Sequence, residues 1–342
     1  MAVRYDTDRS EAAMERNLEL EKLFADMRKI QRRFLNEYGV NDIWSNSKIY
    51  EVLQANTLGH RMIPGHSGSL DAVDSDGRQY EYKHFKELSS NHSWTFNDYS
   101  LSTISKLLNE VEAVVFAHID DTIFPPRMDW SYTVTGEDTA KYLKEHTKGI
   151  RNTRKMINIS ANQLETRVGC VRIIHERRSR DGAYTSELAR IFDVISKLEK
   201  IVGTSNILTS NKFWEVLVSL PLGHTVNSEQ GGRAGAHDAY DLKLRDYEYK
   251  VSSTKSWNFQ DISPQVLNKY LNCEEIVLAV VDKTGIELKS VWFAKPNLVV
   301  GKLKQKLKEK EIRFLSEGKE IRRLQVSISS GDLGDIGARK MV

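Results

Sequence analysis

Two segments of this chain, one starting at residue 71 and the other at residue 238, carry the same arrangement of acidic and basic residues. The first begins with Asp71-Ala72-Val73-Asp74 and ends with Glu81-Tyr82-Lys83. The second begins with Asp238-Ala239-Tyr240-Asp241 and ends with Glu248-Tyr249-Lys250, and 8 of its 13 residues are identical to those of the first. Because the arrangement occurs twice, we expect the fold to build the same local structure twice.

The similarity continues on both sides of these segments. Residues 43–60 agree with 207–224 at 8 of 18 positions, and residues 93–109 agree with 256–272 at 8 of 17. In the three blocks together 24 of 48 positions agree, whereas unrelated sequences of ordinary composition agree at roughly one position in seventeen. The sequence therefore predicts two tandem domains, 18–166 and 187–342, with an N-terminal extension at 1–17 and a linker at 167–186.

Length and composition agree with this division. A chain of 342 residues is long enough for two domains, and its 40% hydrophobic content allows each half its own core. The net charge of +3 is too small to identify a partner. The two cysteines, Cys170 and Cys273, occupy unmatched positions and form no metal-ligand spacing, which favours a reduced, cytoplasmic location. No run of 18 apolar residues occurs, so neither export nor membrane insertion is expected.

The hydrophobic periodicity predicts the same order of elements in both halves. We expect an amphipathic helix (18–38 and 187–201), a second helix that ends at a glycine (48–58 and 212–222), a two-stranded hairpin (69–73 with 79–83, and its counterpart), a third helix capped by Asp98 or Asp261, and a strand buried on both faces (113–119 and 276–281). The predicted fold class is α/β, with an α+β type mixed sheet flanked by helices.

The hairpin brings acidic and basic side chains to one place. Glu81 and Lys83 are two residues apart on a strand, so both project from one face while Tyr82 projects from the other. The neighbouring strand can bring Asp71 alongside them. Two carboxylates of this kind suit Mg²⁺, which completes its coordination with water and phosphate oxygens. The expected reaction is metal-assisted hydrolysis of a phosphodiester.

These residues resemble the motif of the PD-(D/E)xK nuclease superfamily, which includes most type II restriction endonucleases. The family pattern, an Asp at the end of one strand and Glu-x-Lys on the next, is matched by Asp71, Glu81 and Lys83, and again by Asp238, Glu248 and Lys250. Glu51 and Glu215 resemble the acid that many members carry on a preceding helix. The motif's proline is absent from both copies, as it is in many members.

The resemblance implies a restriction-endonuclease-like fold, duplicated in tandem as an intramolecular pseudo-dimer. It also implies that the eight residues just named are catalytic, and that Asp71, Glu81, Asp238 and Glu248 bind Mg²⁺, for which Mn²⁺ can substitute. Most of these restriction enzymes are homodimers with one site for each DNA strand. The expectation is therefore a monomer that cleaves both strands of double-stranded DNA at a specific sequence. A cognate methyltransferase is a partner that such enzymes often have.

Several neighbouring residues have a structural interpretation beside a functional one. Asp74 and Asp241 fall in the hairpin turns and are better turn formers than metal ligands. His60 and His224 are more suited to capping or packing than to general base catalysis, and Trp94, Phe96, Trp257 and Phe259 are typical core residues. Loop residues that could contact DNA at the rim of the sites are Lys86, Asn91, His92, Gln230, Arg233, Ser253 and Lys255.

Two other functions use the same residues. A repair, transposition or recombination nuclease would prefer branched, damaged or single-stranded DNA over a plain duplex. A non-catalytic DNA-binding protein would be expected to lose a ligand in at least one half, and both halves retain all of them.

Overall fold

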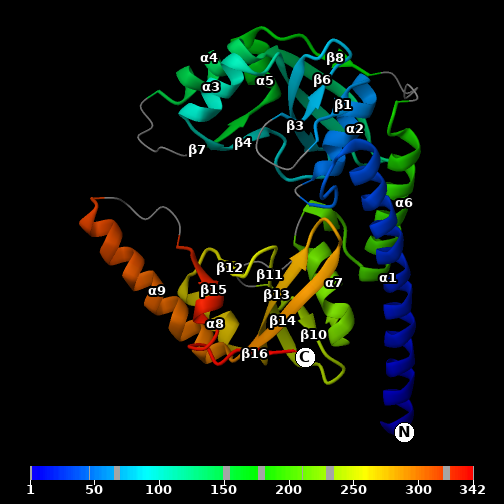
Figure 1. The fold of residues 1–342 in the computed structure, drawn as a ribbon, viewed down its shortest axis with the longest axis vertical. Coiled ribbons are helices and arrows are strands. Elements are labelled where there is room, and N and C mark those ends of the chain that lie inside the picture. Colours follow the sequence, from blue (N-terminus) through cyan, green and yellow to red (C-terminus); the bar gives the residue numbers. More distant parts are fainter. Residues whose placement is uncertain are drawn as a thin grey trace. The chain divides into compact units, whose positions relative to one another are not determined.

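The computed structural model describes residues 2–45, 47–64, 70–148, 155–175, 182–209, 211–228, 235–318 and 324–341. The chain forms two compact units (Figure 1). One unit is Ile30–Asp193, and the other combines Met1–Lys29 with Val194–Val342. The two boundaries between these units fall inside helices, one in α1 (Ala2–Tyr38) and the other in α6 (Thr185–Val202). The ranges 18–166 and 187–342 refer to the repeated sequence and stay a prediction.

The unit Ile30–Asp193 contains a six-stranded mixed sheet. The strand order is β1 (Arg61–Met62), β2 (Ala72–Val73), β3 (Gln79–Lys86), β5 (Ala113–Asp120), β6 (Arg127–Thr135) and β8 (Ile173–Ile174). Only the β3–β5 pair of this sheet is parallel. A separate antiparallel pair joins β4 (Trp94–Tyr99) to β7 (Lys155–Ile159). The continuous apolar run in β5 is explained by burial on both faces of the sheet.

Helices cover the faces of this sheet. The helices α3 (Leu101–Asn109) and α4 (Gly136–His146) pack against each other (Figure 1), and they share one core cluster with the inner face of β5 and β6. The helix α2 (Lys48–Leu58) packs instead against β3 and β6. A short α5 (Ala161–Gln163) is continued by one π-helical turn, Leu164–Val168.

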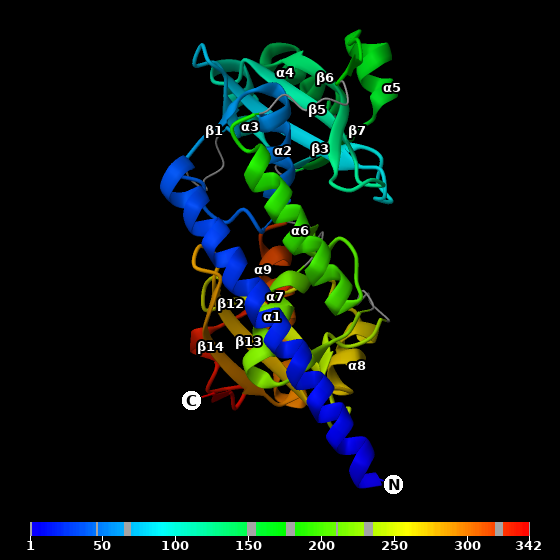
Figure 2. The same cartoon turned by 90° about the vertical axis from the view of Figure 1, so that its right-hand side faces the viewer.

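The other unit repeats this order of elements. Its sheet order is β9 (Thr225–Val226), β10 (Ala239–Tyr240), β11 (Asp246–Ser252), β13 (Glu275–Asp282), β14 (Glu287–Ala294) and β16 (Arg339–Lys340), with β11 and β13 parallel. A second antiparallel pair joins β12 (Ser256–Phe259) to β15 (Val326–Ser329). The helix α7 (Lys212–Leu222) packs against β11 and β14, while α8 (Pro264–Leu271) packs against α9 (Pro296–Ser316). The paired strands β13 and β14 lie side by side in Figure 2. Short 3₁₀ turns lie at Ile207–Thr209 and Ser330–Asp332.

The prediction of mixed sheets flanked by helices is confirmed, and so are the helices 48–58 and 212–222 and the two buried strands. Three details are corrected. The predicted helix 18–38 begins at Ala2, because the residues around Ala12 and Ala13 are strong helix formers. The predicted linker 167–186 contains β8, which pairs with β6.

The third correction concerns the helix caps, which are Ser100 and Ser263 and not Asp98 and Asp261. Asp98 still belongs to β4, so the cap falls two residues later. Asp261 has a φ of 50°, whereas a residue at the N-cap needs an extended backbone. Ser263, with a φ of −105°, accepts a hydrogen bond from the Val266 N–H.

Two tryptophans connect the small strand pairs to the large sheets, as expected of core residues. Trp94 and Trp257 are fully buried, and the indole N–H of each donates to a carbonyl oxygen of the central strand, Ala117 or Ala279, at 2.8 Å. Phe96 and Phe259 are also buried. Each tryptophan therefore fixes the position of the strand that passes beside the Glu-x-Lys residues.

The change Trp257→Phe is expected to lower the free energy of unfolding by about 2 kcal/mol, because it removes buried volume and leaves the Ala279 carbonyl without its donor. Trp292→Phe, in the same core cluster, is the volume control and is expected to cost about half as much. Urea unfolding of both variants measures the difference. Equal losses would contradict a role for the hydrogen bond.

Candidate active site

The aspartate of each copy is held by the strand that carries Glu-x-Lys. Asp71 immediately precedes β2, and its Oδ2 accepts the backbone N–H of Tyr82 at 2.8 Å. Asp238 precedes β10 and accepts the N–H of Tyr249 at the same distance. The aspartate is therefore fixed beside the glutamate and the lysine that flank this tyrosine.

The glutamate and lysine of each strand lie on one face, as the alternation of strand side chains predicts. Lys83 Nζ donates to Glu81 Oε1 at 2.5 Å, and Lys250 Nζ donates to Glu248 Oε1 at 2.9 Å. The tyrosine between them is buried on the other face of the strand. In the first half, the hydroxyl of Tyr82 lies at hydrogen-bond distance, 2.8 Å, from Nδ1 of His60.

Tyr249 makes the same contact with His224 at 2.8 Å. The two histidines therefore pack and hydrogen-bond behind the sites, as expected. Asp74 and Asp241 also fulfil their expected structural role, because each accepts two backbone N–H groups of its hairpin turn.

Each of the two predicted helix glutamates belongs to one of the clusters. Glu51 in α2 pairs with Lys48 Nζ, which also lies 3.5 Å from Asp71 Oδ1. Glu215 in α7 pairs with Lys212 Nζ at 2.9 Å. All eight residues predicted to be catalytic therefore fall into two clusters of four, one in each unit.

The prediction from sequence missed two pairs of lysines. Lys106 in α3 and Lys269 in α8 each place Nζ 3.2 Å from Oε2 of the motif glutamate, Glu81 or Glu248. Lys48 and Lys212 likewise pair with the helix acids. All four lie at positions that are identical between the aligned halves, and this identity is the signal that could have found them.

Burial and charge set the protonation of the first cluster. Burial, and then the charge of Asp71, raise the pKa of Glu51 to about 8. Burial would lower the pKa of Lys83, but the charges of Glu81 and Asp71 outweigh it and raise that pKa. Lys83 thus remains an ammonium ion, while the raised pKa of Glu51 favours its protonated form at neutral pH.

The second cluster has the same acids in a more enclosed setting. Burial, and then the charge of Asp238, raise the pKa of Glu215 to about 7. Burial and the charge of Glu248 raise the pKa of Asp238. Burial would also raise the pKa of Glu248. The nearby Lys250, His237 and Lys269 outweigh this effect, so the pKa of Glu248 is lowered. The side chain of Glu248 is 5% exposed, against 18% for Glu81.

His237 distinguishes the second cluster from the first. Its Nδ1 lies 3.5 Å from Glu248 Oε2, and the residue that precedes Asp71 at the matching position is Leu70. Tyr270 similarly takes the place of Leu107, and Lys250 Nζ lies 5.2 Å from the centre of its ring. The second lysine is therefore enclosed by an additional aromatic side chain.

Each cluster opens into a pocket. The pocket of the second unit measures about 470 Å³ and is lined by Glu215, Asp238, Glu248, Lys250, Lys269 and the outward residues of β12. The pocket of the first unit measures about 380 Å³ and is lined by Glu81, Lys83, Lys106, Thr95, Phe96 and Asn97 among others. The motif glutamate and lysine therefore line a pocket in both units, and the motif aspartate lines it in the second.

Of the residues predicted to contact DNA at the rim, four are exposed in loops and one is buried. Asn91, His92, Ser253 and Lys255 are exposed in the loops that follow β3 and β11. Lys86 is buried, with Nζ 3.5 Å from Asp121 and 5.3 Å from the Tyr50 ring centre, so it packs inside the unit and does not line the pocket. Gln230 and Arg233 lie outside the described residues.

The donor set fits a hard divalent cation held partly by substrate. In the part of the chain that the structure describes, no group of three or more His, Cys, Asp or Glu side chains could hold a metal by itself. Magnesium commonly takes one or two protein carboxylates and completes its octahedron with water and phosphate oxygens. Asp71 with Glu81, and Asp238 with Glu248, supply two each. An oxygen of Asp71, Glu81 and Glu248 already faces an ammonium group.

No family model matches the chain, and no curated protein matches its sequence. Across the described ranges, no helix is both long and apolar enough to cross a lipid bilayer.

The change Glu51→Gln is expected to stabilise the metal-free chain at high pH. A carboxyl whose folded pKa is raised from 4.5 to about 8 gives stability that is present at low pH and is lost as pH rises through about 8. Glutamine avoids this loss, so its free energy of unfolding at pH 8.5 should exceed that of the wild type by about 1 kcal/mol or more.

Thermal unfolding in EDTA at pH 6 and pH 8.5 measures this effect. Glu110→Gln, at an exposed position of the first unit, is the matched control and should leave the pH dependence unchanged. A Glu51→Gln variant with the pH dependence of the wild type would contradict the buried, protonated state of Glu51.

Proposed function

We propose that this chain is a Mg²⁺-dependent, sequence-specific endonuclease that cleaves both strands of double-stranded DNA, with one active site in each half. The observation that carries the proposal is the double occurrence of one arrangement. In both units an aspartate accepts the tyrosine N–H, the neighbouring glutamate pairs with the lysine two residues on, and a helix glutamate pairs with its own lysine.

The order of the elements supports a duplicated, restriction-endonuclease-like fold. Each unit has a hairpin, a parallel pair of central strands, an antiparallel neighbour, and a separate two-stranded ribbon tied to the centre by tryptophan. Together with the identities between the halves, this correspondence supports an intramolecular pseudo-dimer that acts as a monomer. The resemblance to the PD-(D/E)xK nucleases supplies the function.

The residues of each site have separate roles in the proposed reaction. A bound divalent cation would supply Lewis acidity and lower the pKa of a water molecule. Asp71 is held in position by the Tyr82 N–H, and the Lys83 ammonium places positive charge where a phosphate gains negative charge.

Glu51 holds a proton at neutral pH near both of these groups. Asp238, Lys250 and Glu215 take the same roles in the other half. Lys106 and Lys269 hold the motif glutamates and add positive charge near the entering phosphate.

Separate Asp71→Ala and Asp238→Ala variants test the assignment of one site to each strand. Each is expected to convert supercoiled plasmid into nicked circles, with linear product reduced at least about a hundredfold, because a single intact site remains. Gel electrophoresis of timed digests in Mg²⁺ measures the products. The double variant should produce neither nicks nor breaks.

Asp76→Ala and Asp246→Ala provide matched controls, because each removes an exposed carboxylate from the same hairpin region. Both should linearise plasmid as the wild type does. Full linearisation by either Asp71→Ala or Asp238→Ala would contradict the two-site mechanism. Wild-type activity on branched but not on linear duplex DNA would instead favour a repair or recombination nuclease.

A further inference from the structure

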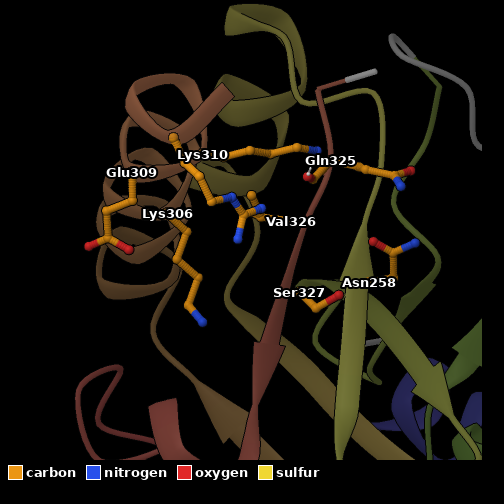
Figure 3. Close-up of a pocket in the computed structure, with 8 residues that line it drawn as sticks. Asn258, Lys306, Glu309, Lys310, Gln325, Val326 and Ser327 are labelled. Atoms are coloured by element: carbon orange, nitrogen blue, oxygen red, sulfur yellow. Dashed lines mark hydrogen bonds between the residues drawn. The ribbon is translucent and has the colours of Figure 1, made fainter. Parts of the chain in front are cut away.

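A second hollow lies beside the active site in the unit that contains α9. Its volume is about 520 Å³, and it lies between α9 and the β12–β15 ribbon. Figure 3 shows its lining, with Lys306 and Lys310 on α9 and with Asn258, Gln325 and Ser327 on the strand side. Nothing in the proposed catalytic reaction uses these residues.

One face of α9 supplies the hollow with positive charge. Lys306, Lys310 and Arg313 follow one another at spacings of four and three residues, which places them on one side of a helix. Lys310 crosses to the ribbon and donates to the Gln325 carbonyl at 2.8 Å (Figure 3), and Lys306 pairs with Asp332 at 2.7 Å. These bonds hold the Lys310 amine against the edge of the ribbon and the Lys306 amine against the turn that follows β15.

The cations in the hollow outnumber its acids. Glu309 is the acidic residue among those that line it, against two lysines and one arginine. Burial, and then the charge of Arg313, lower the pKa of Lys310. An anion in the hollow would relieve this crowding of like charges.

The hollow adjoins the pocket of the proposed active site. Asn258 lines both pockets. On β12 the residues alternate, so that Ser256, Asn258 and Gln260 are exposed and line the active-site pocket while Trp257 and Phe259 are buried. Ser327 of β15 lies opposite Asn258 in the register. A track of hydroxyl and amide groups thus leads from the catalytic cluster to the cations of α9.

We propose that this track binds the sugar-phosphate backbone of the DNA strand that is cut in the second half, with Lys310 and Arg313 contacting phosphates next to the scissile one. The proposal rests on the nuclease function proposed above. Arginine, lysine and amide side chains are the usual partners of backbone phosphate oxygens, and such contacts position a strand without reading its sequence. The hollow would therefore add affinity and orientation, not specificity.

The contact is assigned to the second half alone. The helix α9 has 21 residues, whereas α4, at the matching place in the first half, has 11 and ends at His146. Residues 149–154, which follow it, lie outside the described part of the chain.

The double change Lys310→Gln with Arg313→Gln in the full-length chain tests the proposal. Binding of a short fluorescent DNA duplex is measured by anisotropy in Ca²⁺, which replaces Mg²⁺ so that binding is seen without cleavage, over a series of KCl concentrations. We expect affinity to fall about tenfold or more, and the slope of log K against log salt to decrease by about two, because two phosphate contacts are lost.

Lys304→Gln with Lys308→Gln is the matched control, because both lysines are exposed on α9 and do not line the hollow. It removes the same charge from the same helix, so affinity should change by less than about twofold. Equal losses in the two double variants, or no loss in Lys310→Gln with Arg313→Gln, would overturn the proposal.

Arg313→Gln alone keeps the bond between Lys310 and the Gln325 carbonyl, and it should reduce the slope by about one if the double variant unfolds. The two proposals fail in different ways. A wild-type chain that neither binds nor cuts DNA would overturn the nuclease function. A wild-type chain that binds and cuts, beside a Lys310 and Arg313 variant that binds equally well, would overturn only the backbone track.

Discussion

In each half of this chain an aspartate carboxylate accepts the backbone N–H of the tyrosine between a glutamate and a lysine. This hydrogen bond joins the beginning of the first hairpin strand to the second strand, which carries Glu-x-Lys, and it decides which side chains meet. Once it is formed, the glutamate and the lysine face the aspartate, while the tyrosine points to the other face and finds a histidine. Three acidic side chains and three lysines are then held together in a partly buried place. Their mutual pairing offsets the large cost of removing so many charges from water.

Much of this arrangement could be predicted from sequence, because it depends on short-range rules. The two-residue alternation of a strand places Glu81 and Lys83 on one face, and the repeat between the halves identifies Glu51 as a partner. The lysines Lys106 and Lys269 were not predicted, because their contact with the glutamates depends on how a helix packs against a strand. The caps were missed by two residues, since they depend on backbone angles at Asp261 that sequence patterns do not specify. The short strands β8 and β16 have too few residues to show any alternation.

The two halves keep the same acids but surround them differently. His237 and Tyr270 stand beside the second cluster where the first has Leu70 and Leu107. The second glutamate is more buried, and its pKa is lowered by the charge of Lys250 and then by a contact with His237, whose place in the first half is taken by Leu70. The same acidic residues therefore lie in two different electrostatic environments. In the proposed nuclease, this difference and the 21 residues of α9, against 11 in α4, would make the two halves contact the two DNA strands unequally.

The central claim is that each cluster binds a divalent cation between its two motif carboxylates. Anomalous diffraction from crystals of the full-length chain soaked in Mn²⁺ tests this claim most directly. The account predicts one strong peak beside Asp71 and Glu81 and another beside Asp238 and Glu248. Soaked crystals with no manganese peak at either cluster would contradict it.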